Sequence, residues 1–234
     1  MKRLEQVLLG ASVLLGVYSC TKSIPASDPP GLAPIQFQSV EDNLAHDTLL
    51  IQATFNLGDG SFVMVASNVE DTWEGLRLYR YRPHPDSTAD MMAISVPAYD
   101  SWTMLPTFFG KDSTRTGDLW VLANFGERES WGQKLFRLRD GFEDLGFIDA
   151  AAIERVEEEG GMLLKRRNIA PHARLEFVGD SAWIRFACDS VYLYDDQRGG
   201  YDYVIAASSV KYLSAPEGLS LWVNGEKREV KKPG

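Results

Sequence analysis

Short apolar segments separated by polar turns run along most of the chain, and this pattern predicts β-strands. Residues 76–82 (LRLYRYR) and 135–139 (LFRLR) alternate between two faces, as strands do because successive side chains point to opposite sides. In the first of these segments Leu76, Leu78 and Arg80 share one face, and the tyrosines lie on the other. Both faces therefore carry large side chains, which favours sheets that are packed on both sides.

The strand pattern repeats three times. Units over about residues 48–99, 102–154 and 173–212 each contain four segments rich in β-branched and aromatic residues. Gly-Asp recurs near the first turn of each unit, and a leucine follows it in the same order. These landmarks are Gly58-Asp59, Gly117-Asp118, Gly179-Asp180, Leu78, Leu135 and Leu193. The repeat predicts an all-β fold of antiparallel four-stranded units within a single domain over 35–234.

Four-stranded units of about 50–60 residues resemble the blades of β-propellers, which have at least about four blades. Segments 35–42 and 219–230 either complete a fourth blade, or the units form a β-sandwich or an open barrel. Asn224-Gly225 predicts a C-terminal hairpin over 219–230 in each of these folds. One short helix is expected over 150–161 (AAAIERVEEEGG), after Asp149 as its cap, with the following MLLKRRN pairing with it as a protruding element.

The N-terminus has the features of a secretory signal. Lys2 and Arg3 precede an apolar run over 7–17, shorter than the ~20 residues that span a bilayer. The run ends in Val-Tyr-Ser-Cys20, which resembles the lipobox of bacterial lipoproteins. That resemblance implies that residues 1–19 are a removable signal peptide and that Cys20 carries a diacyl lipid. The Pro- and Ser-rich segment 20–34 then reads as a flexible tether.

In lipoproteins of the Bacteroidota, surface export is associated with acidic residues soon after the lipidated cysteine. Here the first acid is Asp28, so the resemblance implies an outer-membrane protein that faces the periplasm. With Cys20 lipidated, Cys188 has no disulfide partner, and its apolar neighbours predict an inert, buried thiol. A net charge of −9 argues against nucleic acid as a partner. We expect no cofactor, and membrane contact through the lipid alone.

Chemical motifs are few. Gly179-Asp180-Ser181 resembles the nucleophile block of GDSL-type hydrolases, but the next segment reads as a strand and no histidine follows His172, so a β-turn is the better interpretation. The Gly-Asp turns also resemble the calcium loops of FG-GAP repeats, which makes Asp59, Asp118 and Asp180 candidate calcium ligands; the alternative is a turn stabilised by its own carboxylate. No residue is predicted to be catalytic.

Two tryptophans beside turns are the remaining candidates for ligand binding. Trp73 lies near Asp71 and Glu74, and Trp131 lies near Glu129. An aromatic ring with neighbouring carboxylates suits stacking on a sugar, although such residues also cap the edges of a core. The sequence therefore predicts a non-catalytic binding or scaffold lipoprotein for an envelope protein partner. The alternative is a glycan-binding or glycan-processing lipoprotein.

Overall fold

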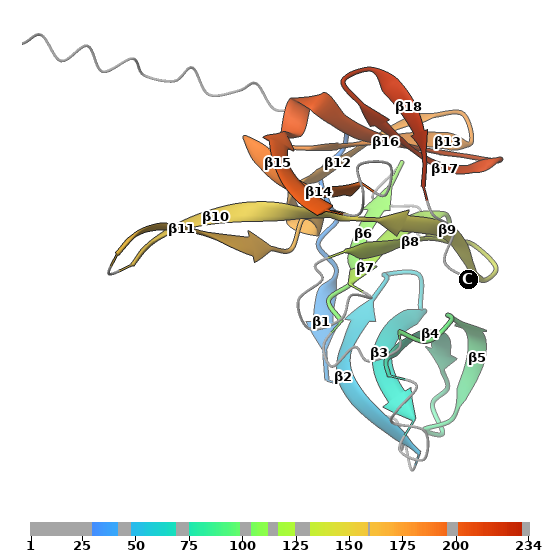
Figure 1. Cartoon of the computed structure of the whole chain (residues 1–234). Helices are drawn as coiled ribbons and strands as arrows, with labels where there is room; N and C mark the ends of the chain where they lie inside the picture. Colours follow the sequence, from blue (N-terminus) through green and yellow to red (C-terminus); the bar gives the residue numbers. More distant parts are fainter. Residues whose placement is uncertain are drawn as a thin grey trace, which may run out of the picture.

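The computed structural model is built almost entirely from β-strands (Figure 1). Strands make up 68% of it, and the described residues contain no helix of seven or more residues. They do contain two 3-10 turns, at Ala170–His172 and Ala207–Ser209. The all-β prediction is confirmed. The structure describes residues 30–41, 48–68, 75–98, 104–111, 117–124, 132–158, 160–195 and 201–230.

The first two sheets are antiparallel meanders in which each strand pairs with the next along the chain. The first contains the strands of the predicted unit 48–99 and one strand from segment 35–42, so this segment does not join 219–230 in a fourth blade; the second lies within the predicted unit 102–154. The first sheet consists of β1 (Gln38–Val40), β2 (Leu49–Asn56), β3 (Phe62–Asn68), β4 (Arg77–Pro83) and β5 (Ala89–Ile94). The second consists of β6 (Thr107–Gly110), β7 (Leu119–Asn124), β8 (Gln133–Leu138) and β9 (Phe142–Ile148).

The third predicted unit is divided between two sheets. The third sheet has the order β12 (Ala173–Val178), β13 (Ser181–Phe186), β16 (Val210–Ala215), β17 (Gly218–Val223), β18 (Glu226–Glu229). The fourth, which we call the hairpin sheet, has the order β11 (Gly161–Arg167), β10 (Ala150–Glu158), β14 (Ser190–Asp195), β15 (Tyr201–Ala206). The β14–β15 pair is thus inserted between β13 and β16.

This insertion explains why Leu193 is not the third member of the leucine series. Leu193 lies in β14 and pairs with Ala150 of the hairpin sheet. Leu135 pairs with Leu122, four residues after Asp118. In the third sheet Ile184 stands four residues after Asp180, and it pairs with Tyr212. The regular spacing of the leucines therefore did not reflect equivalent positions.

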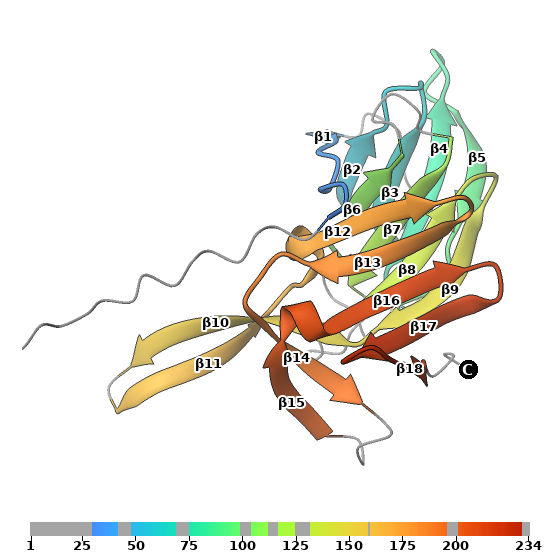
Figure 2. The same ribbon diagram turned by 90° about the horizontal axis from the view of Figure 1, so that it is seen from above.

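The predicted helix over 150–161 is wrong, because Ala150–Glu158 form β10 and Gly161 begins β11. Alanine and glutamate favour a helix locally, but tertiary pairing overrides such weak preferences. Ala150 and Ala152 are buried in the core, and β10 pairs with β14 at its start and with β11 from Ala152 to Glu158. Glu154 and Glu158 form ion pairs with Arg167 and Lys165 of β11. The predicted pairing with MLLKRRN is confirmed, and Figure 2 shows the two strands extending away from the body.

The C-terminal hairpin is confirmed. Strands β17 and β18 pair from Val223↔Glu226 outward, so Asn224 and Gly225 form a two-residue turn. Both have positive φ, 53° and 85°. A type I′ turn requires this conformation at both central positions, and Asn-Gly adopts it at low cost.

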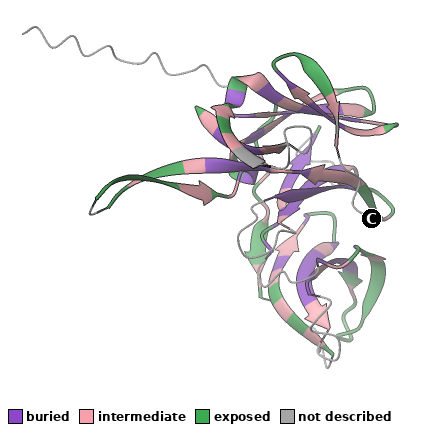
Figure 3. Ribbon diagram, in the orientation of Figure 1, coloured by how far each residue is buried: buried purple, intermediate pink, exposed green. Residues whose placement is uncertain are grey.

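The second sheet is the middle layer, and both of its faces are buried (Figure 3). One face packs against the first sheet, where Leu119, Val121 and Phe136 meet Val63 and Leu78. Its other face packs against the third sheet and the base of the hairpin sheet; the side chains there include Phe109, Trp120, Leu122, Ile184, Val191 and Tyr212. The four sheets are antiparallel, and none closes on itself.

Candidate functional site

The aspartates of two Gly-Asp turns bind an arginine of a nearby strand in the same sheet. Asp59 precedes β3 and binds Arg80 of β4, and Asp118 precedes β7 and binds Arg137 of β8. The Asp59 carboxylate accepts a hydrogen bond from the backbone N–H of Ser61 at 2.8 Å and forms an ion pair with Arg80 at 3.1 Å. The Asp118 carboxylate binds Arg137 through Nε at 2.8 Å and Nη2 at 3.0 Å. Both guanidinium groups are largely buried, and the aspartates neutralise charges that are costly to bury alone.

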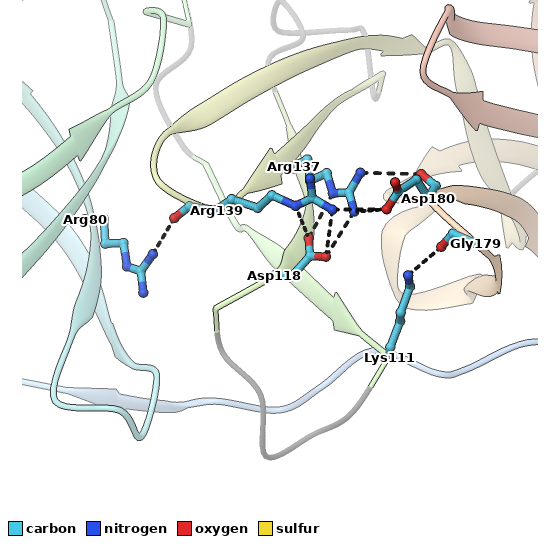
Figure 4. Close-up of polar contacts among 7 residues, drawn as sticks. All are labelled: Arg80, Lys111, Asp118, Arg137, Arg139, Gly179 and Asp180. Atoms are coloured by element: carbon cyan, nitrogen blue, oxygen red, sulfur yellow. Dashed lines mark hydrogen bonds and ion pairs between the residues drawn. The ribbon is translucent and has the colours of Figure 1, made fainter.

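The same arginines connect neighbouring sheets (Figure 4). Arg80 donates to the backbone oxygen of Arg139 at 2.7 Å, which joins the first sheet to the second. Arg137 lies 3.3 Å from the Asp180 carboxylate and 3.4 Å from its backbone oxygen, which joins the second sheet to the third. Lys111 also donates to the backbone oxygen of Gly179. These contacts form a polar clamp across three sheets.

The three candidate calcium ligands are therefore held by arginines. Arg137 and Arg139 both contact Asp118 and Asp180, whereas Asp59 lies with Arg80. Among the residues that the structure describes, no group of three or more His, Cys, Asp or Glu side chains is arranged to hold a metal ion.

Sequence reasoning missed the role of Arg80 and Arg137. A signal was present, because each arginine follows an aligned leucine, Leu78 or Leu135, by two positions. Residues two apart in a strand lie on the same face. Each arginine therefore points toward the same core as its leucine.

The residues predicted to bind sugars lie outside the described residues. These are Asp71, Trp73, Glu74, Glu129 and Trp131. The lipidation candidate Cys20 also lies outside them. Lipidation and sugar stacking stay predictions.

The outer face of the hairpin sheet exposes apolar side chains beside a hollow. Alternation places it opposite the buried face that contains Ala152 and Val191. The paired positions Arg155↔Leu164 and Tyr192↔Val204 lie on this outer face. Leu164 is 39% exposed and Val204 is 48% exposed. The neighbouring Arg166 guanidinium lies 5.1 Å from the centre of the Tyr192 ring, so cations border the apolar side chains.

A hollow of about 380 Å³ opens on this outer face. Its sheet side is apolar apart from the Arg155 guanidinium, and the opposite wall is formed by the bend before β14 together with His172. It is lined by Ile153, Arg155, Leu164, His172, Ala187, Cys188, Asp189, Ser190 and Val204. A volume of this size admits one or two side chains of a partner, with the arginine available to a carboxylate.

Cys188 in this hollow is half-buried and free. Burial, and then the negative charge of Asp189, raise the pKa of its thiol to about 11. The thiolate is the nucleophilic form of cysteine, so this side chain stays protonated and inert near neutral pH. Its Sγ donates to the backbone oxygen of Ser190 at 3.6 Å.

A second hollow, of about 300 Å³, lies where β9 meets the turn between β16 and β17. Glu143, Asp144 and Glu217 line it, and Asp144 forms an ion pair with Lys134 at 2.7 Å. Acidic side chains alone select no ligand, and this hollow has no exposed aromatic ring in its lining. The hairpin sheet therefore remains the stronger candidate for a binding surface.

No protein-family model, curated protein or solved structure matches this chain. Within the described ranges, no helix is long and apolar enough to cross a membrane.

Proposed function

We propose that this protein is a lipid-anchored, non-catalytic binding or scaffold lipoprotein of the bacterial envelope. Its outer face on the hairpin sheet binds a protein partner, and Cys20 carries the lipid that holds it on the periplasmic side of the outer membrane. The observation that carries the binding proposal is the exposed apolar surface around Leu164 and Val204, bordered by Arg155 and Arg166.

The lipobox-like Val-Tyr-Ser-Cys20 and the apolar run before it support the anchor. The Pro- and Ser-rich segment after Cys20 gives the domain reach from the bilayer. A lipid and a tether hold the domain near the membrane, which raises its effective concentration toward other envelope components there.

The composition of the outer face supports a protein partner. Contiguous exposed apolar side chains rimmed by polar groups mark interaction surfaces, and arginine is enriched at protein interfaces. The hollow beside Leu164 provides a pocket for an anchoring side chain. Because the chain as a whole is acidic, the arginines at this face favour an approaching segment that carries carboxylates.

We also infer that the first three sheets are arranged in a propeller-like manner. Their successive packing through the two main cores supports this, as does the repeated Asp-Arg contact at their turns. The hairpin sheet is then an addition to the repeated sheets. An added element of this kind can bind a partner without disturbing the packing of the repeat.

Two substitutions at matched positions test the binding surface. Val204→Lys places a charge on the outer face, whereas Val178→Lys places one on β12, where the valine is 57% exposed. With the full lipidated chain as bait, we expect Val204→Lys to lose a stoichiometric envelope protein that the wild type and Val178→Lys both retain. Equal retention by both variants contradicts the proposal.

The anchor is tested separately with Cys20→Ala. We expect this variant to leave the membrane fraction, and its intact mass to lack the diacyl group. If Cys20→Ala stays in the membrane fraction as the wild type does, the lipid anchor is wrong.

A further inference from the structure

Strand β11 is a sheet edge with an uncharged apolar stretch, Met162, Leu163 and Leu164. It is the terminal strand of the hairpin sheet, it pairs with β10 without a register shift, and it contains no proline. Natural proteins usually protect long edges with bulges, prolines or charged side chains, because unpaired backbone groups there accept another strand. The charged residues of β11, Lys165, Arg166 and Arg167, are confined to one end, so the apolar stretch 162–164 lacks this protection. Figure 1 shows the hairpin projecting beyond the other sheets, so the body leaves this edge accessible.

Apolar side chains are exposed on both faces of this edge. Met162 and Leu164 lie on the outer face and are 63% and 39% exposed. Leu163 lies on the opposite face and is 44% exposed. A partner that covered one face would leave Leu163 or its neighbours in water, whereas a strand added at the edge brings side chains to both faces.

The charges of the hairpin are separated along its length. Glu157 and Glu158 lie near the tip, and Lys165, Arg166 and Arg167 lie near the base. Glu154 also lies near the base, where it pairs with Arg167, but the cations outnumber it, so the base is positive and the tip is negative. An antiparallel copy of the same hairpin places its acidic tip beside this basic base, and the converse contact occurs at the other end. The hairpin is therefore complementary in charge to itself.

We propose that a second copy of this chain pairs with the first along β11, antiparallel, with Leu163 on the two-fold axis. Met162 of each copy then lies opposite Leu164 of the other, and Lys165 lies opposite Gly161, close to the acidic tip. The contact is isologous, and it joins two hairpin sheets into one continuous sheet. It uses the sheet edge and shares only Leu164 with the proposed partner surface, so substitutions at Leu163, on the opposite face, test it separately from partner binding.

Disulfide trapping tests the register directly. Directly opposite residues in an antiparallel pair have Cα atoms about 4.5–5.5 Å apart, within the range that a disulfide bridges. In the full-length protein in its membrane, mild oxidation should convert Leu163→Cys into a disulfide-linked dimer. Val178→Cys, which is exposed on the edge strand β12, should remain monomeric. If both variants behave alike, the proposed pairing is wrong.

Sedimentation gives a second test that needs no cross-link. The detergent-solubilised wild type should approach twice the monomer mass as its concentration rises, and added salt should weaken this association. Leu163→Lys places two charges on the axis and should raise the dissociation constant at least about tenfold, since each 1.4 kcal/mol lost at an interface is a factor of ten. At concentrations where both proteins are monomeric its melting temperature should match that of the wild type, because Leu163 is 44% exposed in the monomer and the stabilisation by association is absent there. Association unaffected by Leu163→Lys in a folded protein overturns the proposal.

Discussion

Arg137 and Arg139 form ion pairs with the same two aspartates but differ in burial, so substituting each in turn compares a buried ion pair with an exposed one. Both guanidinium groups contact Asp118 and Asp180. The Arg137 side chain is 8% exposed, and its guanidinium also lies 4.2 Å from the centre of the Trp120 ring. The Arg139 side chain is 45% exposed. If the polar clamp stabilises the stacked sheets, the buried arginine must contribute more.

We expect Arg137→Met to lower the free energy of unfolding by about 3 kcal/mol. Removing one member of a buried ion pair costs about 3–5 kcal/mol, and the remaining contact between Arg139 and Asp118 favours the lower end. Arg139→Met should cost less than about 1 kcal/mol, as exposed pairs do. For a domain of this size, about 3 kcal/mol corresponds to a fall in melting temperature of about 6–12 °C.

Urea unfolding measures both changes through the midpoint, and an unchanged slope indicates that the unfolded states are comparable. Equal losses in the two variants, or a loss below about 1 kcal/mol for Arg137→Met, would refute the view that the clamp holds the sheets together.

Three further predictions concern packing, reactivity and sugar binding. Gly146→Ala should lower the melting temperature in a thermal scan, because Gly146 has φ +126° and an added Cβ would lie 3.1 Å from Leu219; an unchanged melting temperature would contradict this contact. Alkylation of Cys188 at pH 8 should be about 100-fold slower than that of a thiol with pKa 9.0 and should accelerate as pH rises toward its pKa of about 11; a rate that levels off near pH 9 would show that the thiol is not shielded. If the glycan alternative holds, replacing Trp73 and Trp131 with alanine should abolish binding in a polysaccharide screen without lowering the melting temperature, and unchanged binding would count against it.

Local signals predicted the parts of the fold in which neighbouring segments pair. The first two meanders and the Asn224-Gly225 turn follow from alternation and turn chemistry within a few residues. The division of LRLYRYR into two faces was also right, since Leu78 lies in one core cluster and Tyr79 lies in another.

Long-range pairing was beyond the reach of the same signals. Residues 150–158 have the composition of a helix, and they are a strand because β11 and β14 pair with them. Leu193 kept the expected spacing, yet it lies in an inserted pair of strands. The hollow on the outer face was missed for the same reason, because Leu164 and Val204 line one hollow only when β14 and β15 join the hairpin.

The central claim is that the outer face of the hairpin sheet contacts a protein partner in the envelope. Site-specific photocrosslinking in living cells tests it most directly, with the photoreactive side chain at Val204 and, as control, at Val178. The account predicts a discrete adduct between the Val204 derivative and one envelope protein, and no such adduct from Val178. No adduct from Val204, or the same adducts from both positions, would contradict it.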